Sequence, residues 1–178
     1  MIRGLVLVVS AYLAVIAQEF LPAMPFFAGA HLLLLPVVVC YAILWMPFPA
    51  ALAFALYAGL LGDLAMLHVD GEHVEIGLGW SMLYYVLLAA ALRLPPALQF
   101  EPRWEIHCLV SGAATFLLLA GQYLVVCLRR EMFVLNGAVF AQIVGPALAA
   151  LLLAPLLYHF FGLFPGGGLR RRSRRVTR

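Results

Sequence analysis

The sequence predicts an all-α, polytopic integral membrane protein, built as a bundle of about six transmembrane helices. Of its 178 residues, 66% are hydrophobic and 11% are charged, and the mean hydropathy is +1.05. Soluble domains are about 45–50% apolar and about 25% charged. A span needs about 20 apolar residues, so the chain can hold about five to seven spans and no substantial soluble domain. This composition excludes a soluble enzyme, a disordered chain and a nucleic-acid-binding domain.

Six apolar runs, separated by prolines, glycines or charges, give the expected spans. They are residues 4–21, 30–46, 50–67, 76–92, 106–128 and 137–164, which form one transmembrane domain over residues 1–165. Pro36 lies inside the second run, where we expect a kink. Before the last span, either Met132–Asn136 is a connecting turn or a longer helix bends near Gly145-Pro146. Residues 166–178 form a glycine-rich break and a basic tail.

The first run has a signal peptide as its alternative interpretation, because a basic residue precedes it and a small residue, Ala17, stands near its end. Its length, and the five spans that follow, favour an uncleaved first helix.

The arginines predict the orientation of the spans. Six spans place both termini on one side, and loops on the cytoplasmic side carry the excess of positive charge. With the tail inside, the inner arginines are Arg3, Arg93, Arg103, Arg170, Arg171, Arg172, Arg174, Arg175 and Arg178, and the outer ones are Arg129 and Arg130. We therefore expect both termini in the cytoplasm, the acidic loop His68–Glu75 outside, and anionic lipid bound by the tail.

Asp63 is the charged residue that most needs an explanation, because it lies about 13 residues into the third run. A charge inside a span costs roughly 2.5–3.5 kcal/mol on insertion scales. Gly59 and Gly62 flank it, and small residues let a neighbouring helix approach closely. Two interpretations remain open: Asp63 contacts a partner, ion or substrate, or it holds the bundle together through an internal hydrogen bond or ion pair.

The same two interpretations, contact with a partner or an internal bond, apply with less force to other polar residues. Glu19 stands at the outer end of the first run, and Arg129 and Arg130 are at the same level, where they are candidate partners for both acids. For Asn136 and Gln142, in or next to the last run, we expect interhelical hydrogen bonds.

No sequence pattern predicts catalysis or a cofactor. The outer loop contains His68, Asp70, Glu72, His73 and Glu75, with His31 expected at the same level. Their spacing matches no metal-ligand template, so a solvated loop is the preferred interpretation and a metal site the alternative. Neither GxSxG nor HExxH is present. The three cysteines lie in apolar runs as small hydrophobic residues. Trp45, Trp80, Trp104, Tyr84 and Tyr85 are expected to pack or to lie at the membrane interface.

The stretch from His31 to Ala65 resembles the bacterial rod shape-determining protein MreD family. It has a short second helix, a proline-containing turn and then Gly59-Leu-Leu-Gly-Asp63 in the third helix. Further features of the resemblance are Gly77 to Gly79 in the outer loop, Tyr84-Tyr85, Asn136-Gly137, Pro146 and the basic tail.

The resemblance implies a six-helix fold similar to the substrate-binding subunits of energy-coupling-factor vitamin transporters. It also implies a non-enzymatic scaffold of cell elongation in the bacterial cytoplasmic membrane. Such a scaffold binds the membrane-anchored protein MreC and so helps couple the MreB filament to the synthases of peptidoglycan.

The alternative is a transporter subunit in which Asp63, Glu19 and the outer loop line a small-molecule pocket. A vitamin binder needs a polar cavity of at least about 300 Å³ that opens outward. A scaffold should instead have a filled interior and an apolar groove on its outside.

Overall fold

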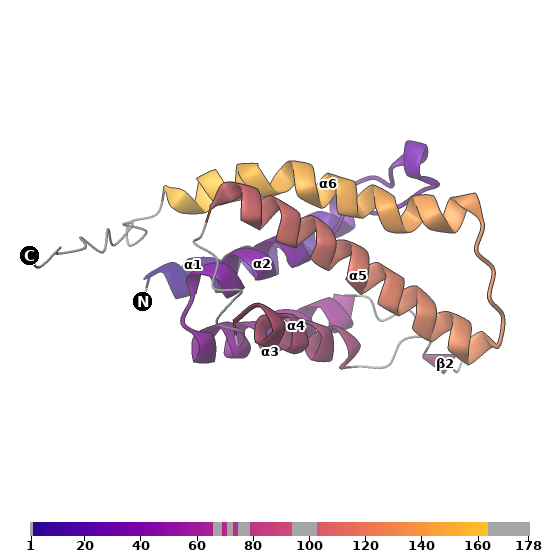
Figure 1. Cartoon of the computed structure of the whole chain (residues 1–178), viewed down its shortest axis with the longest axis horizontal. Coiled ribbons are helices and arrows are strands. Elements are labelled where there is room, and N and C mark those ends of the chain that lie inside the picture. Colours follow the sequence, from indigo (N-terminus) through magenta and orange to yellow (C-terminus); the bar gives the residue numbers. More distant parts are fainter. Residues whose placement is uncertain (1, 66–68, 71–72, 75–78, 94–102, 164–178) are drawn as a thin grey trace, which may run out of the picture.

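The computed structural model describes residues 2–65, 69–70, 73–74, 79–93 and 103–163, and in these residues the chain is a bundle of six α-helices (Figure 1). The helices are α1 (Ile2–Phe20), α2 (Leu35–Trp45), α3 (Phe48–Ala65), α4 (Trp80–Arg93), α5 (Trp104–Arg130) and α6 (Gly137–Gly162). A 3-10 turn, η1 (Pro25–Phe27), follows α1. The strands β1 (Val69–Asp70) and β2 (His73–Val74) form a two-residue antiparallel hairpin. The predicted all-α class is confirmed, and the predicted tail, residues 166–178, lies outside the described residues.

Three of the helices are long and apolar enough to cross a membrane. These are α3, α5 and α6, with 18, 27 and 26 residues. The apolar part of α1, Gly4–Phe20, is slightly shorter, and α2 and α4 have 11 and 14 residues. At 1.5 Å per residue, α2 and α4 are only about 16 and 21 Å long. The chain is thus a helical membrane protein by length and composition, with two helices that end well short of a full span.

Helix α2 is the centre of the bundle. It contacts each of the other five helices, and every residue from Leu35 to Leu44 is buried. A helix that is apolar on all sides has no stripe to turn toward water and is stable only when surrounded. The largest cluster of buried side chains accordingly includes Val38, Val39 and Ile43 of this helix.

The start of α2 differs from the prediction. The run at residues 30–46 is helical only from Leu35, because the chain before it is held in a loop in which Met24 N donates to Ala30 O at 2.9 Å. Pro36 therefore lies in the first turn of α2 and does not kink its middle as expected. Proline is favoured there, since the first amides of a helix have no partner within it.

The two interpretations of the last run are also resolved by the structure. The segment between α5 and α6 is not helical, and α6 begins at Gly137 and continues past Pro146 and Pro155. Met132–Asn136 is therefore a connection.

Two closely packed helix pairs flank α2, and glycines allow both contacts. A Cβ atom added to Gly59 of α3 would lie 2.6 Å from the backbone nitrogen of Met82 in α4. In the other pair, a Cβ atom on Gly112 of α5 would lie 3.3 Å from the Cβ of Leu151 in α6. These distances show that α3 packs backbone to backbone on α4, whereas α5 packs on α6 with more room.

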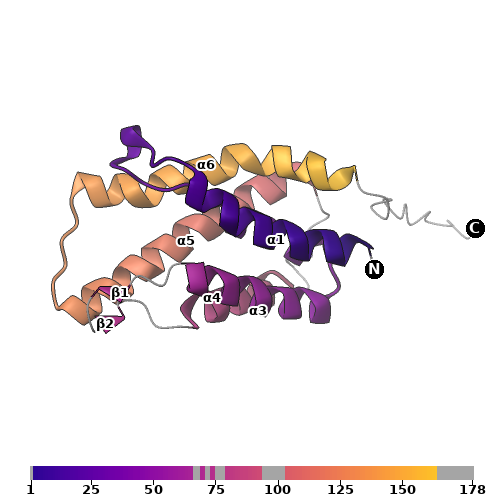
Figure 2. The ribbon, with the colours of Figure 1, turned by 180° about the vertical axis from the view of Figure 1, so that it is seen from behind.

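The helices alternate in direction, so the start of α1 and the end of α6 lie at one end of the bundle (Figures 1 and 2). We call this the near end. The opposite end, called the far end, carries the end of α1, the β-hairpin and the connection between α5 and α6.

Replacing Gly59 by alanine should destabilise the protein, because the new methyl group meets the backbone of Met82 and not a movable side chain. Overpacking of this kind costs about 1–3 kcal/mol, which should lower the unfolding temperature in detergent. Gly162→Ala is the matched control, since a Cβ atom there has nothing within 4 Å. Equal unfolding temperatures for the two variants would contradict the close α3–α4 packing.

Candidate functional site

The Asp63 carboxylate on α3 caps the start of α4. Its Oδ2 accepts a hydrogen bond from Gly79 N at 2.7 Å, and its Oδ1 accepts one from Ser81 N at 2.9 Å. The first amides of a helix have no acceptor within that helix, and here Ser81 is buried. Asp63 supplies the missing acceptors from a neighbouring helix, and its charge is also favourable at the positive end of the α4 dipole.

Both glycines of the predicted motif lie beside this cap. Gly59, Gly62 and Asp63 occupy one face of α3, since they are three and four residues apart. A Cβ atom on Gly62 would lie 3.8 Å from the side chain of Ser81 and 3.1 Å from Leu35 of α2. The absence of side chains at positions 59 and 62 therefore brings α4 close enough for Asp63 to reach its first amides.

Arg93, in the last turn of α4, caps the end of α2. Its Nε donates to Ile43 O at 2.6 Å, and its Nη2 donates to Met46 O at 2.8 Å. The last carbonyls of a helix have no donor within the helix, and the guanidinium group offers several donors in a fixed fork. From the sequence, Arg93 was identified only as a charge that sets orientation. The structure shows that it also closes the end of α2.

A line of buried polar side chains on α5 faces the centre of the bundle. His107, Ser111 and Thr115 are fully buried and Gln122 is 8% exposed. His107 Nε2 lies 3.2 Å from Val37 O of α2, so the tautomer protonated at Nε2 donates to that carbonyl. This line was not predicted from the sequence. The spacing of four residues from His107 to Ser111 to Thr115 is the signal that could have revealed it.

The other charged candidates lie at the surface. Glu19 is exposed near the end of α1, and Arg129 and Arg130 are exposed on the last turn of α5. Asp63 bonds to the backbone amides of Gly79 and Ser81.

Asn136 and Gln142 bond to the backbone. Asn136 is the N-cap of α6, with its Oδ1 accepting from Val139 N at 2.9 Å. Gln142 Nε2 donates to Ala28 O at 3.1 Å, which ties α6 to the loop after α1.

The acidic loop falls largely outside the described part of the chain. Residues His68, Glu72 and Glu75 are not described, nor are the side chains of Asp70 and His73. Among the described residues, no group of three or more histidine, cysteine or acidic side chains is arranged to hold a metal ion. His31 is exposed at the far end.

Most of the expected aromatic residues pack inside the bundle. Tyr85 is 1% exposed, and Tyr84 OH donates to Ala114 O of α5 at 2.6 Å. Trp80 packs over Gly121, where a Cβ atom would lie 3.1 Å from its ring. Trp104, at the near end of α5, is 49% exposed and is suited to the membrane interface.

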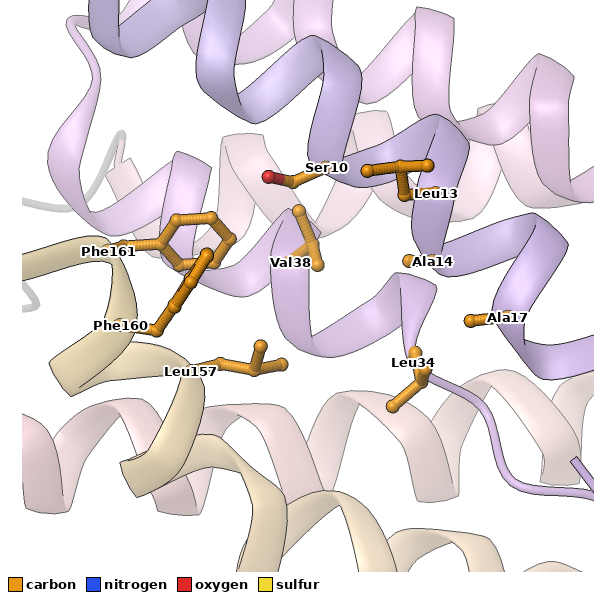
Figure 3. Close-up of a pocket in the computed structure, with 9 residues that line it drawn as sticks. All are labelled: Ser10, Leu13, Ala14, Ala17, Leu34, Val38, Leu157, Phe160 and Phe161. Carbon is orange, nitrogen blue, oxygen red and sulfur yellow. The ribbon is translucent and has the colours of Figure 1, made fainter. Parts of the chain in front are cut away.

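An apolar groove separates α1 from α6. It has a volume of about 240 Å³ and is lined by Ser10, Leu13, Ala14 and Ala17 of α1, Leu34 and Val38 at α2, and Leu157, Phe160 and Phe161 of α6. The side chains from these elements surround a common space (Figure 3). We call it the α1–α6 groove. Its floor is the central helix, and its single polar lining side chain is Ser10.

A second hollow, of about 250 Å³, which we call the far-end hollow, lies between the loop after α1 and helices α5 and α6. It is lined by Gly29, Ala30, His31, Leu33, Leu119, Gln142 and Pro146. Asp63 and Glu19, the acids expected to line a small-molecule pocket, line neither this hollow nor the groove.

Comparisons of the chain with family models, curated proteins and solved structures give no match. The site is therefore interpreted from its geometry.

Asp63→Leu should destabilise the bundle, because it leaves two amides at the start of α4, those of Gly79 and Ser81, without acceptors, at a cost of about 1–3 kcal/mol each. Asp63→Asn keeps one acceptor oxygen but loses the charge, so its unfolding temperature should fall between those of wild type and Asp63→Leu. Thermal unfolding of the three proteins in the same detergent measures this order. Wild-type stability of Asp63→Leu would contradict the capping role.

Arg93→Lys should also lower the unfolding temperature, although it keeps the positive charge. A lysine ammonium is a point donor and cannot reproduce the fork between Ile43 O and Met46 O. Arg93→Met should lower the unfolding temperature further, because both carbonyls lose a charged donor and the free energy of unfolding should fall by about 1–3 kcal/mol in all. If lysine behaves like arginine, the position needs only a charge and the forked cap is not required.

Proposed function

We propose that this chain is a non-enzymatic membrane scaffold of the bacterial cell-elongation machinery, similar to MreD. In this role it binds an MreC-type membrane protein and, through it, helps link the MreB filament to the synthases of peptidoglycan. The observation that carries the proposal is a closed centre with an apolar groove on the outside. The resemblance of residues 31–65 to the MreD family adds to it.

The closed centre favours a scaffold because the charged side chains Asp63 and Arg93 are engaged in holding helices. Both oxygens of Asp63 bond to α4, and the Arg93 guanidinium bonds to two carbonyls at the end of α2. Helix α2 fills the middle with buried apolar side chains. A binder of small molecules would need such polar groups turned toward a cavity.

The α1–α6 groove is suited to a partner helix within the membrane. On the α1 side it has the small residues Ser10, Ala14 and Ala17, which permit close approach of another helix. The large side chains Leu157 and Phe160 form the opposite wall. Helices in lipid associate through packing of this kind, because lipid tails are as apolar as leucine.

The runner-up function is a substrate-binding subunit of a vitamin-type transporter, and the far-end hollow is the observation in its favour. The hollow is lined by the polar side chains His31 and Gln142, which could bind a small molecule. Its volume of about 250 Å³ is below the roughly 300 Å³ expected of such sites, and its lining is mainly apolar. We therefore rank this function second.

The proposal includes a location in the cytoplasmic membrane with six helices in the bilayer and both termini in the cytoplasm. The near end then faces the cytoplasm, and it carries Arg93 and Arg103, in accord with the excess of positive charge inside. The tail would add contacts to anionic lipid. The proposed arrangement of helices is similar to the energy-coupling-factor substrate-binding subunits.

Filling the groove should weaken partner binding. Ala17→Phe places a ring in the α1–α6 groove, and we expect several-fold less MreC-type protein to co-purify from mild detergent. Ala113→Phe is the matched control, because Ala113 is exposed on α5 away from the groove. Equal recovery of the partner with both variants would exclude the groove as the binding site. Absence of any MreC-type partner with the wild-type chain would contradict the proposed function itself.

A further inference from the structure

The connection between α5 and α6 exposes an unusual amount of apolar surface. The chain leaves α5 at Glu131, whose φ of +52° turns it sharply. The next four residues, Met132, Phe133, Val134 and Leu135, are 67, 67, 53 and 65% exposed. We call Met132–Leu135 the strap. It crosses the far end of the bundle between the separated ends of α5 and α6 (Figure 1).

Contacts with α5 fix the level of the strap. Tyr123 OH donates to Val134 O at 2.6 Å, and the rings of Tyr123 and Phe133 have centroids 6.0 Å apart. Tyr123 lies about two turns before the end of α5. The strap therefore lies beside the last turns of α5 and does not extend away from the bundle.

The charged residues at the two ends of α5 indicate how deep the strap lies in a bilayer. From Glu105 to Arg129 the helix rises about 36 Å at 1.5 Å per residue. Because α5 crosses the bundle obliquely (Figure 1), this length matches a hydrocarbon core of about 30 Å with a charged residue in each headgroup layer. Arg129 and Arg130 then lie among the lipid phosphates at the far end, and the strap lies next to them.

The strap suits the boundary between headgroups and hydrocarbon better than either neighbouring layer. Its side chains are apolar and gain by leaving water. Its backbone is not helical and accepts a hydrogen bond from Tyr123 at Val134 O. In the hydrocarbon core, non-helical backbone exposed to lipid would leave polar groups unsatisfied. At the boundary, water and headgroups can satisfy the backbone while the side chains enter the acyl layer.

Two phenylalanines near the far end are also highly exposed, like the side chains of the strap. Phe20, at the end of α1, is 85% exposed, and Phe26, in η1, is 94% exposed. Exposed phenylalanine side chains of interfacial segments insert into the boundary between headgroups and acyl chains. Figure 2 shows η1 projecting from the bundle near the far end of α6.

We propose that the strap, together with Phe20 and Phe26, is an interfacial anchor that seats the far end of the bundle in the lipid headgroup boundary. Its partner is the bilayer itself, with phosphates near Arg129 and Arg130 and acyl chains around Phe133. The anchor holds the outer ends of α5 and α6 apart. It is independent of the proposed scaffold function.

Depth measurement with a spin label tests the anchor. The label is placed by Phe133→Cys or Phe26→Cys in a chain carrying Cys40→Ala, Cys108→Ala and Cys127→Ala, reconstituted alone in phosphatidylethanolamine–phosphatidylglycerol vesicles. We expect nickel-chelate accessibility several-fold below that of a label from Arg130→Cys, and several-fold above that of a label from Leu117→Cys on the lipid-facing side of α5. Nickel accessibility equal to that at position 130 would place the strap in water. Shielding from both oxygen and nickel chelate would mean that protein covers it. Either result overturns the proposal.

A second measurement leaves the cysteines in place, in case their removal impairs folding. Phe133 is replaced by p-benzoylphenylalanine, the vesicles are irradiated, and adducts are identified by mass. We expect lipid adducts at a yield similar to that of the same replacement at Phe116, which is exposed on α5. Adducts between two protein chains at position 133, or no adduct there beside a normal yield at position 116, would overturn the anchor.

Discussion

The ends of two short helices, α2 and α4, are the constraint on which the rest of the structure depends. Helix α4 is too short to bring both of its ends to a membrane surface, and at its start the buried Ser81 amide needs an acceptor from the protein. Asp63 caps α4 from α3, and Arg93 caps α2 from α4. Each cap joins two helices, so the caps also fix how α2, α3 and α4 pack.

Because Asp63 and Arg93 bond to backbone groups of neighbouring helices, they do not line a cavity inside the described part of the bundle. The surfaces that remain for binding are on its outside. The centre is filled by α2, while the α1–α6 groove and the strap present apolar side chains outward. The groove and the strap lie in different parts of the bundle, so a partner helix and the lipid boundary could be contacted at the same time.

The sequence predicted the helical class because apolar runs of span length leave few alternatives, and it singled out Asp63 because a charge there is costly. It could not predict the partners of Asp63, since amides 16 and 18 residues away become neighbours only when α3 packs on α4. The length of α2 was overestimated because an apolar loop and an apolar helix look alike in composition. His107 and Arg93 were missed as structural residues because their acceptors belong to α2, about 50 to 70 positions earlier in the chain.

Amide hydrogen exchange of Gly79 and Ser81 in lipid nanodiscs tests the central claim most directly. The first amides of a helix normally exchange fast, because no carbonyl of the helix accepts from them. If Asp63 caps α4, both amides should exchange as slowly as those in the middle of α4, and Asp63→Ala should remove that protection while amides of α5 and α6 keep theirs. Exchange of Gly79 and Ser81 in the wild-type protein at the rate of an unstructured peptide would contradict the account.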